Sequence, residues 1–100
     1  MFIALNRFKI APGRGEDFEK SWRQRESHLA GVPGFQEFHL LRGPAGEQAT
    51  LYASHTVWES REAFEAWTRS SAFRDAHAQA GGLEGVVLGP PEFEGFEVVL

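Results

Sequence analysis

The stretch TVWESREAFEAWTRSSAFRDAH, residues 56–77, carries the strongest local signals in this sequence. It begins as the end of an apolar strand, and Ser60 then stands where its side chain can cap the first free amides of a helix. Phe64 and Trp67 lie at helical spacing within that helix. The stretch therefore predicts a strand followed by a capped helix with one aromatic face.

A second short helix is predicted directly after the first. Ser70-Ser71 interrupts the helical pattern with two residues that favour caps. Phe73 and His77 then share an apolar helical face, which ends at Gly81-Gly82. The break lets Trp67 and His77 turn toward a common space, and such a space suits a flat ligand.

Alternating apolar residues on either side of this stretch predict four strands. The predicted strands are residues 2–10, 35–42, 49–58 and 93–100. In the second of them, Phe35, Glu37, His39 and Leu41 are expected on one face, opposite Gln36, Phe38, Leu40 and Arg42. The loop GPAGEQ between the second and third strands is rich in turn formers, so these two strands are expected to form a hairpin.

One further helix is predicted over residues 15–30, where Phe18, Trp22 and Leu29 lie at helical spacing. The element order is then β-α-β-β-α-β, which is the ferredoxin-like arrangement of the α+β class. It has a four-stranded antiparallel sheet with the helices on one face. One hundred residues of ordinary composition predict a single domain, residues 1–100.

The other face of this sheet is expected to pack on a second copy of the chain. Residues 2–5 and 98–100 are apolar on both sides of their strands. A monomer would leave one of those sides in water. A two-fold homodimer is the commonest way to close such a surface, and a different protein as partner is the alternative.

Composition excludes several classes of function. The chain has no cysteine, which rules out disulfides, thiolate metal sites and a cysteine nucleophile. A net charge of −4 and scattered arginines argue against nucleic-acid binding. No segment has the length of a membrane span or the features of a signal peptide, so we expect a cytoplasmic protein with no membrane partner.

Three side chains remain distinctive once these classes are excluded: Asn6, Trp67 and His77. Asn6 lies in the middle of an apolar strand face, where a buried amide costs free energy unless it is hydrogen-bonded. It is either a structural asparagine or a pocket group aimed at a ligand. The alternative role of Trp67 is packing in the core. The alternative role of His77 is that of a cation near the last carbonyl groups of a helix.

Two other histidines, His39 and His55, can approach each other across the predicted hairpin. Such a pair most often consists of surface or interface residues, and metal binding is the alternative.

Over nearly its whole length the sequence resembles the antibiotic-biosynthesis-monooxygenase superfamily of small dimeric ferredoxin-like proteins. Within that superfamily it is most similar to the Isd-type haem-degrading monooxygenases. The resemblance is carried by ALNRF at 4–8, PGF at 33–35, TVWES at 56–60, AFEAW at 63–67 and AFRDAH at 72–77. It implies a dimeric α+β barrel in which each subunit has its own site between helix and sheet.

The resemblance also implies an activity, a haem-degrading monooxygenase that opens the porphyrin ring with O2 and an external electron donor and releases iron. Asn6, Trp67 and His77 match the catalytic residues of the family, and Phe64 and Phe73 complete the expected haem-binding set. His77 is the expected axial ligand of the haem iron. Asn6 is expected to donate a hydrogen bond on the open face of the ring, and Trp67 to press on the porphyrin. Haem is then both cofactor and substrate.

Two other functions stay open on the sequence alone. One is a cofactor-free monooxygenase that acts on a polycyclic aromatic or quinol substrate in the same cavity. The other is a non-catalytic dimer that binds haem or another small hydrophobic ligand.

Overall fold

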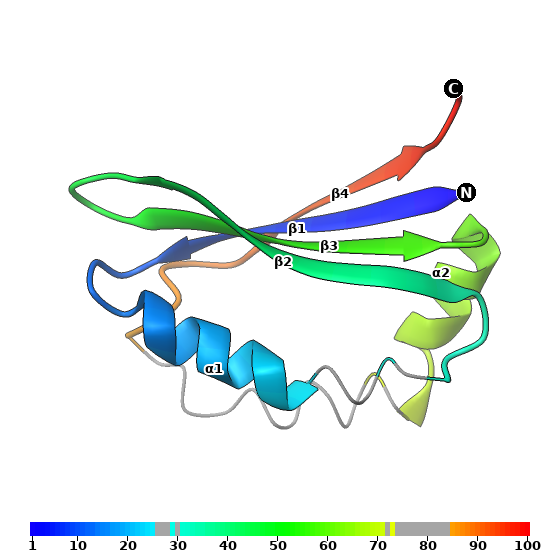
Figure 1. Cartoon of the computed structure of the whole chain (residues 1–100), viewed down its shortest axis with the longest axis horizontal. Coiled ribbons are helices and arrows are strands. Elements are labelled where there is room, and N and C mark those ends of the chain that lie inside the picture. The colour runs from blue at the N-terminus through cyan, green and yellow to red at the C-terminus, as the bar shows by residue number, and fades with distance from the viewer. Residues whose placement is uncertain (26–28, 30, 72, 74–84) are drawn as a thin grey trace.

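The structure, a computed structural model, describes residues 1–25, 29, 31–71, 73 and 85–100. Its elements are β1 (Phe2–Ile10), α1 (Gly15–Arg25), β2 (Phe35–Ala45), β3 (Thr50–Trp58), α2 (Arg61–Thr68) and β4 (Glu92–Glu97) (Figure 1). This order confirms the predicted β-α-β-β-α-β arrangement. No helix within the described ranges is long and apolar enough to cross a membrane.

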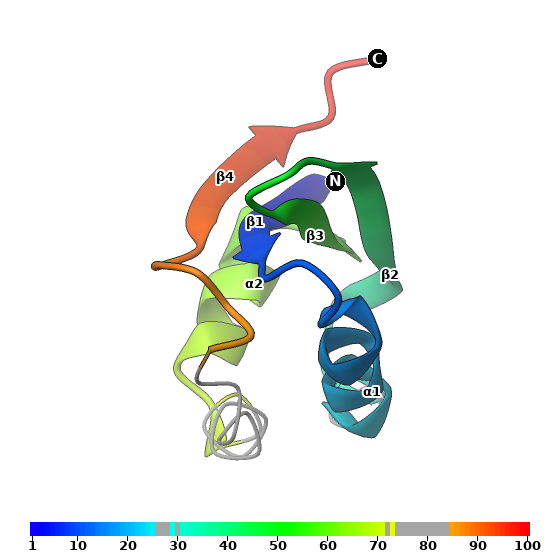
Figure 2. The same cartoon turned by 90° about the vertical axis from the view of Figure 1, so that its left-hand side faces the viewer.

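The four strands form one antiparallel sheet in the order β2-β3-β1-β4. β1 pairs with β3 along its whole length, from Phe2 opposite Trp58 to Ile10 opposite Thr50. Both helices lie on the same side of the sheet, with α1 beneath β2 and α2 toward the opposite side of the molecule (Figure 2). The predicted ferredoxin-like fold, with its helices on one face, is confirmed.

Side chains of the central strands alternate between two faces with different surroundings. Phe2, Ala4 and Ile10 of β1 are buried, as are Tyr52 and Trp58 of β3, on the side that faces the helices. We call this side the helix face and the opposite side the outer face. Side chains of the outer face are mostly half-buried or exposed.

The alternation predicted for the second strand is wrong at its first residue. The pairing of β2 with β3 shifts between Phe35 and Glu37, which is a β-bulge. Phe35 therefore lies on the helix face, where its ring packs against Trp58 at 5.6 Å between ring centroids. From Glu37 to Arg42 the predicted alternation holds.

Several predicted boundaries also differ from the structure. β2 continues into the predicted loop as far as Ala45, with a second register shift after Arg42. β4 ends at Glu97, so residues 98–100 lie beyond the strand and are exposed. The helix predicted over 15–30 is described as helical only to Arg25, and Leu29 follows in a turn.

The break after α2 lies where the sequence predicts it, because serine side chains cap both helical starts. Ser60 accepts a hydrogen bond from the backbone N–H of Ala63 at 3.1 Å. Ser70 accepts one from the backbone N–H of Phe73 at 3.2 Å, and Ser71 and Phe73 are helical. The rest of the second predicted helix lies outside the described residues.

Gly34 sets the distance between the start of β2 and α2. Its φ is +82°, in the left-handed region that favours glycine. A Cβ on this residue would lie 2.5 Å from the Cβ of Ala63, which is too close for any other residue. Its carbonyl accepts a hydrogen bond from Glu59 N at 2.7 Å. The turn at Pro33-Gly34 is thus also a point of close packing.

The helix face carries two core clusters, one toward each end of β1. The buried members of the first are Phe2, Ala4, Leu29 and Trp58, and α2 packs against them. The buried members of the second are Ile10, Phe18, Tyr52 and Val86, and Phe18 belongs to α1. Burying a large apolar side chain stabilises a fold by roughly 1.5–3 kcal/mol, so each cluster is a substantial source of stability.

In this second cluster, the contribution of Tyr52 to folding stability depends on pH. It is the only tyrosine of the chain, it is buried, and its hydroxyl donates to Glu19 Oε2 at 2.5 Å. Burial raises the pKa of Tyr52 above 10.0, and the hydrogen bond to Glu19 and its negative charge raise it further. Arg42 partly opposes this shift of the pKa.

We predict that tyrosinate absorbance of the folded protein titrates with a midpoint above 10.0, the value expected after unfolding. Because the folded pKa is the higher one, the stabilisation is fully present below about pH 10 and is lost as pH rises through the folded pKa. Ultraviolet absorbance at increasing pH, with and without urea, measures both midpoints.

The matched control for this titration is Glu19→Gln, which removes the neighbouring charge and should bring the folded midpoint closer to 10.0. A folded midpoint at or below the unfolded one would contradict the assignment.

Candidate functional site

A cavity of about 530 Å³ lies between the helix face and the two helices. Its volume falls within the range of roughly 300–1,000 Å³ that is typical of ligand pockets. Its lining from the sheet and helices is Ala4, Asn6, Phe8, Phe18, Trp22, Phe38, Ser54, Thr56, Phe64, Trp67, Thr68 and Phe93. The lining draws on both core clusters, so the cavity occupies the space between them.

Four of the five predicted site residues line this cavity. Asn6 comes from β1, Phe64 and Trp67 come from α2, and Phe73 comes from the helical start that follows. The fifth, His77, lies outside the described residues. The sequence therefore brings together side chains from opposite ends of the chain at one cavity.

Asn6 faces a second polar side chain that sequence reasoning missed. It is the direct partner of Ser54 in the pairing of β1 with β3. Ser54 is 5% exposed and also lines the cavity. Directly opposite side chains on one face have Cβ atoms about 4.5–5.5 Å apart, so the amide and the hydroxyl form a polar pair in an apolar wall.

Neither Asn6 nor Ser54 makes a side-chain hydrogen bond within the described part of the chain. A structural asparagine is expected to be bonded to its neighbours, so this arrangement favours the interpretation of Asn6 as a pocket group. Strand alternation places Ser54 on the same face as Tyr52 and Thr56. The signal that was missing is the register that sets it opposite Asn6.

Thr56 is a cavity residue whose hydroxyl is already used. It donates to the carbonyl of Ala4 at 3.3 Å and accepts from Trp58 Nε1 at 2.9 Å. This satisfies the buried indole of Trp58, which would otherwise be costly. Thr56 therefore has a structural role beside the polar pair.

Trp67 has no such partner for its indole. It packs against Trp58 at 5.4 Å and perpendicular to Phe73 at 4.8 Å between ring centroids. Its Nε1 is buried and has no hydrogen-bond partner among the described residues. An unpaired buried N–H is rare in folded proteins, and at a cavity wall it is a donor that a ligand can satisfy.

Phe93 extends the aromatic wall toward solvent. It lies opposite Asn6 in the pairing of β1 with β4, and its ring stacks on Phe64 at 5.6 Å with the planes 8° apart. The residue is 52% exposed, so it lines the cavity at the edge of the molecule. Sequence reasoning did not identify it, because its place follows from the sheet order.

A second hollow of about 450 Å³ lies next to the cavity, beside α1 and β2. Trp22 and Phe38 line both spaces, and their rings stack at 5.5 Å. The second hollow also contains Glu19, which lies 3.7 Å from Arg23 and 3.8 Å from Arg42. Its charged groups are thus occupied with one another, and the apolar cavity remains the better ligand site.

Two of the four histidines, His39 and His55, have positions that the structure describes. His39 and His55 lie on the strands β2 and β3 and do not line the cavity. His28 and His77 lie outside the described residues. Among the described residues that line the cavity there is no histidine.

The cavity combines aromatic walls with polar groups that include the Asn6 amide, the Ser54 hydroxyl and the Trp67 indole N–H. Such a lining binds a flat, largely apolar ligand and fixes its orientation through a few hydrogen bonds. In the described part of the chain no group of three or more metal-ligating side chains is present.

Matches at the level of sequence show what this chain is similar to, and they include one family model and two curated relatives. The family model for antibiotic biosynthesis monooxygenases matches residues 1–79 of the chain. A mycobilin-producing haem oxygenase from Mycobacterium tuberculosis is 35% identical over 98 residues, which cover 98% of this chain and 89% of that protein. A haem-degrading monooxygenase from Bacillus cereus is 30% identical over 88 residues, covering 88% and 81% respectively.

Solved structures that resemble this chain include a haem-degrading enzyme and a cofactor-independent oxygenase. The haem degrader MhuD from Mycobacterium tuberculosis, with two haems bound in its active site, matches with a TM-score of 0.77 and 36% identity. The match covers 100% of this chain and 97% of that one. SnoaB, a cofactor-independent oxygenase from Streptomyces nogalater, has a TM-score of 0.75 but 22% identity, over 99% and 93% of the chains. At that identity the likeness is one of fold alone.

Proposed function

Because the chain belongs to the antibiotic biosynthesis monooxygenase family, we propose that it is a haem-degrading monooxygenase, with haem as both substrate and cofactor. The reaction opens the porphyrin ring with O2 and a reductant and releases iron. The observation that carries the proposal is the single cavity that gathers Asn6, Trp67 and Phe73 under the sheet. The haem-degrading activity of relatives at 30% and 35% identity supports the same substrate.

The residues around the cavity fit a haem. The walls are aromatic and apolar, as the faces of a porphyrin require. The unpartnered Nε1 of Trp67 and the amide of Asn6 offer hydrogen bonds to the polar parts of a bound ligand. Both come from regular elements, so their positions are fixed before the ligand arrives.

When bound, haem supplies the iron at which O2 is activated and the ring carbon that is oxidised. Phe64, Trp67 and Phe73 form walls that exclude water and orient the ring. Asn6, in the middle of a central strand, would donate its amide hydrogen to a ligand bound in the cavity. The protein would thus orient the haem, exclude water from the cavity and supply one hydrogen bond.

We propose that His77, which lies outside the described residues, would supply the protein ligand of the haem iron. It follows Phe73 by four residues, one turn along a predicted helix, and Phe73 lines the cavity. A neutral imidazole nitrogen would be a suitable ligand for that iron.

The reaction needs O2 and electrons from a reductase or a small reductant. We propose the cytoplasm as the location of the protein, since a chain without cysteine needs no oxidising compartment.

We further propose that two copies of the chain pair through the outer face. Phe96, Ile3 and Val57 form an apolar row across β4, β1 and β3 on that face. Phe96 is 48% exposed, and Leu41 on β2 is 45% exposed. Exposed apolar rows on a sheet face are typical of surfaces that associate.

The proposed function predicts that hemin shifts its Soret band on binding the protein, and that the shifted band decays when reductant is added in air. His77→Ala should abolish both the shift and the decay, while the fold survives because a helix tolerates alanine. Visible absorption spectra record both effects. A stable band in the wild type would mean binding alone, and no shift would favour the cofactor-free oxygenase.

His28→Ala is the control for this ligand, and its spectrum should match the wild type. If His28→Ala removes the shift and His77→Ala keeps it, the axial ligand is wrongly assigned.

Asn6→Ala should leave hemin binding nearly intact and slow degradation on the order of a hundredfold, because one preorganised donor is lost. Single-turnover decay of the Soret band measures the rate, and thermal unfolding measures stability. A variant that unfolds at lower temperature but whose folded fraction degrades haem at the normal rate would show that Asn6 is structural.

For assembly, we predict sedimentation of the wild type at twice the chain mass of 11.2 kDa. Phe96→Glu should dissociate the dimer, since it introduces a charge into the apolar row. Ala66→Glu adds the same charge on an exposed position of α2 and should leave the mass unchanged. A wild-type protein that sediments only as a monomer at micromolar concentration would rule the interface out.

A further inference from the structure

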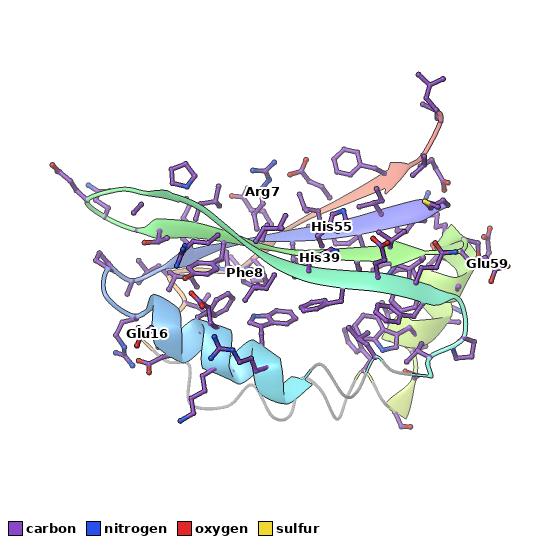
Figure 3. The ribbon with its side chains drawn as sticks, viewed as in Figure 1. Arg7, Phe8, Glu16, His39, His55 and Glu59 are labelled. Atoms are coloured by element: carbon purple, nitrogen blue, oxygen red, sulfur yellow. The ribbon has the colours of Figure 1, made fainter. Side chains whose placement is uncertain are left out.

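Two histidines stand side by side on the outer face, away from the cavity. His39 on β2 and His55 on β3 are direct partners in the antiparallel register, and their ring centroids are 6.0 Å apart (Figure 3). Phe8 lies on the other side of the sheet, toward α1 (Figure 3). The pair is therefore separate from the proposed haem site.

The distance between the rings matches two imidazoles on one metal ion. A zinc–nitrogen bond of about 2.0–2.1 Å puts each ring centre roughly 3.2 Å from the ion, and the two centres then lie about 5–6 Å apart. The 6.0 Å between the ring centres of His39 and His55 lies at the upper end of this range. Two rings in this position are held on rigid, directly paired strands.

Each histidine has one nitrogen atom with defined surroundings. His55 Nδ1 is buried and has no hydrogen-bond partner among the described residues. His39 Nε2 lies 3.9 Å from Glu37 Oε2, on the same strand. A histidine that binds a metal usually presents one nitrogen to the ion and the other to a carboxylate. Glu37 can fill that second role and leave His39 Nδ1 for the ion.

The neighbouring charges do not oppose a cation at this place. Arg7 shares the outer face, and its Nε lies 2.5 Å from Glu94 Oε1. The carboxylate of Glu94 offsets the charge of Arg7, while Glu37 adds a negative charge beside His39.

We propose that His39 and His55 bind one divalent transition-metal ion of the class that prefers imidazole, such as Zn²⁺. No group of three ligating side chains occurs among the described residues, so either water or, in a homodimer paired through the outer face, the histidine pair of the second copy completes the coordination. The site does not depend on haem. A homodimer formed through the outer face brings the histidine pair of the second copy to that face. Binding of one ion per chain or of one ion per dimer would therefore both support the proposal.

The test is a calorimetric titration of haem-free, chelator-treated protein with Zn²⁺. The wild type should bind Zn²⁺ and unfold at a higher temperature with it, since binding to the folded state adds stability. His39→Gln and His55→Gln should each weaken binding by at least about tenfold, and Glu37→Gln by less. Mg²⁺, which prefers oxygen ligands, should not bind.

His28→Gln is the matched control, because it removes an imidazole elsewhere in the chain and should bind Zn²⁺ as the wild type does. His39 has a side chain that is 60% exposed, so its substitution leaves the core unchanged, and circular dichroism checks the fold. If the His39→Gln/His55→Gln double variant binds Zn²⁺ like the wild type, or if the wild type binds none, the proposal is wrong.

Discussion

The structure depends on how two short helices cover one face of a four-stranded sheet. Trp58 packs under α2 at one end of β1, while Phe18 of α1 packs on Tyr52 at the other end. Protein interiors are normally filled to high density, and voids are costly. Here the space between the two clusters is a cavity, and its sheet wall carries the polar pair Asn6 and Ser54. A ligand in this cavity would occupy the place that core side chains take in other domains of this kind.

The two proposed sites and the proposed interface all depend on one register. Asn6 pairs with Ser54, and in this register its side chain faces the cavity. The side chains of its neighbours on β1 then face outward. A slip of one residue would exchange the faces of every side chain in the strand. The register is strongly determined here, because Trp58 and Tyr52 are both buried on the helix face. Cavity and outer face therefore stay on opposite sides of the same central strands.

Much of this fold could be predicted from the sequence, because local signals agree with the tertiary packing. The alternation of β1 and the caps at Ser60 and Ser70 were sufficient to predict the corresponding strand and helix starts. The bulge that turns Phe35 inward could not be predicted, since it depends on how β2 meets its neighbour. Ser54 and Phe93 were missed at the site for a similar reason: only the strand order brings them next to Asn6. His77 has no described position, so its role remains a prediction.

The contact between Trp58 and Trp67 has an optical consequence. The two indoles lie 5.4 Å apart, a separation at which electronic excitation passes readily from one ring to the other. Trp58 is fully buried, whereas Trp67 borders the cavity. Light absorbed deep in the core can therefore be emitted, or lost, at the cavity wall. A coloured ligand next to Trp67 would accept excitation energy from both indoles and quench their fluorescence. The native fluorescence of the chain is therefore a reporter of what occupies the cavity.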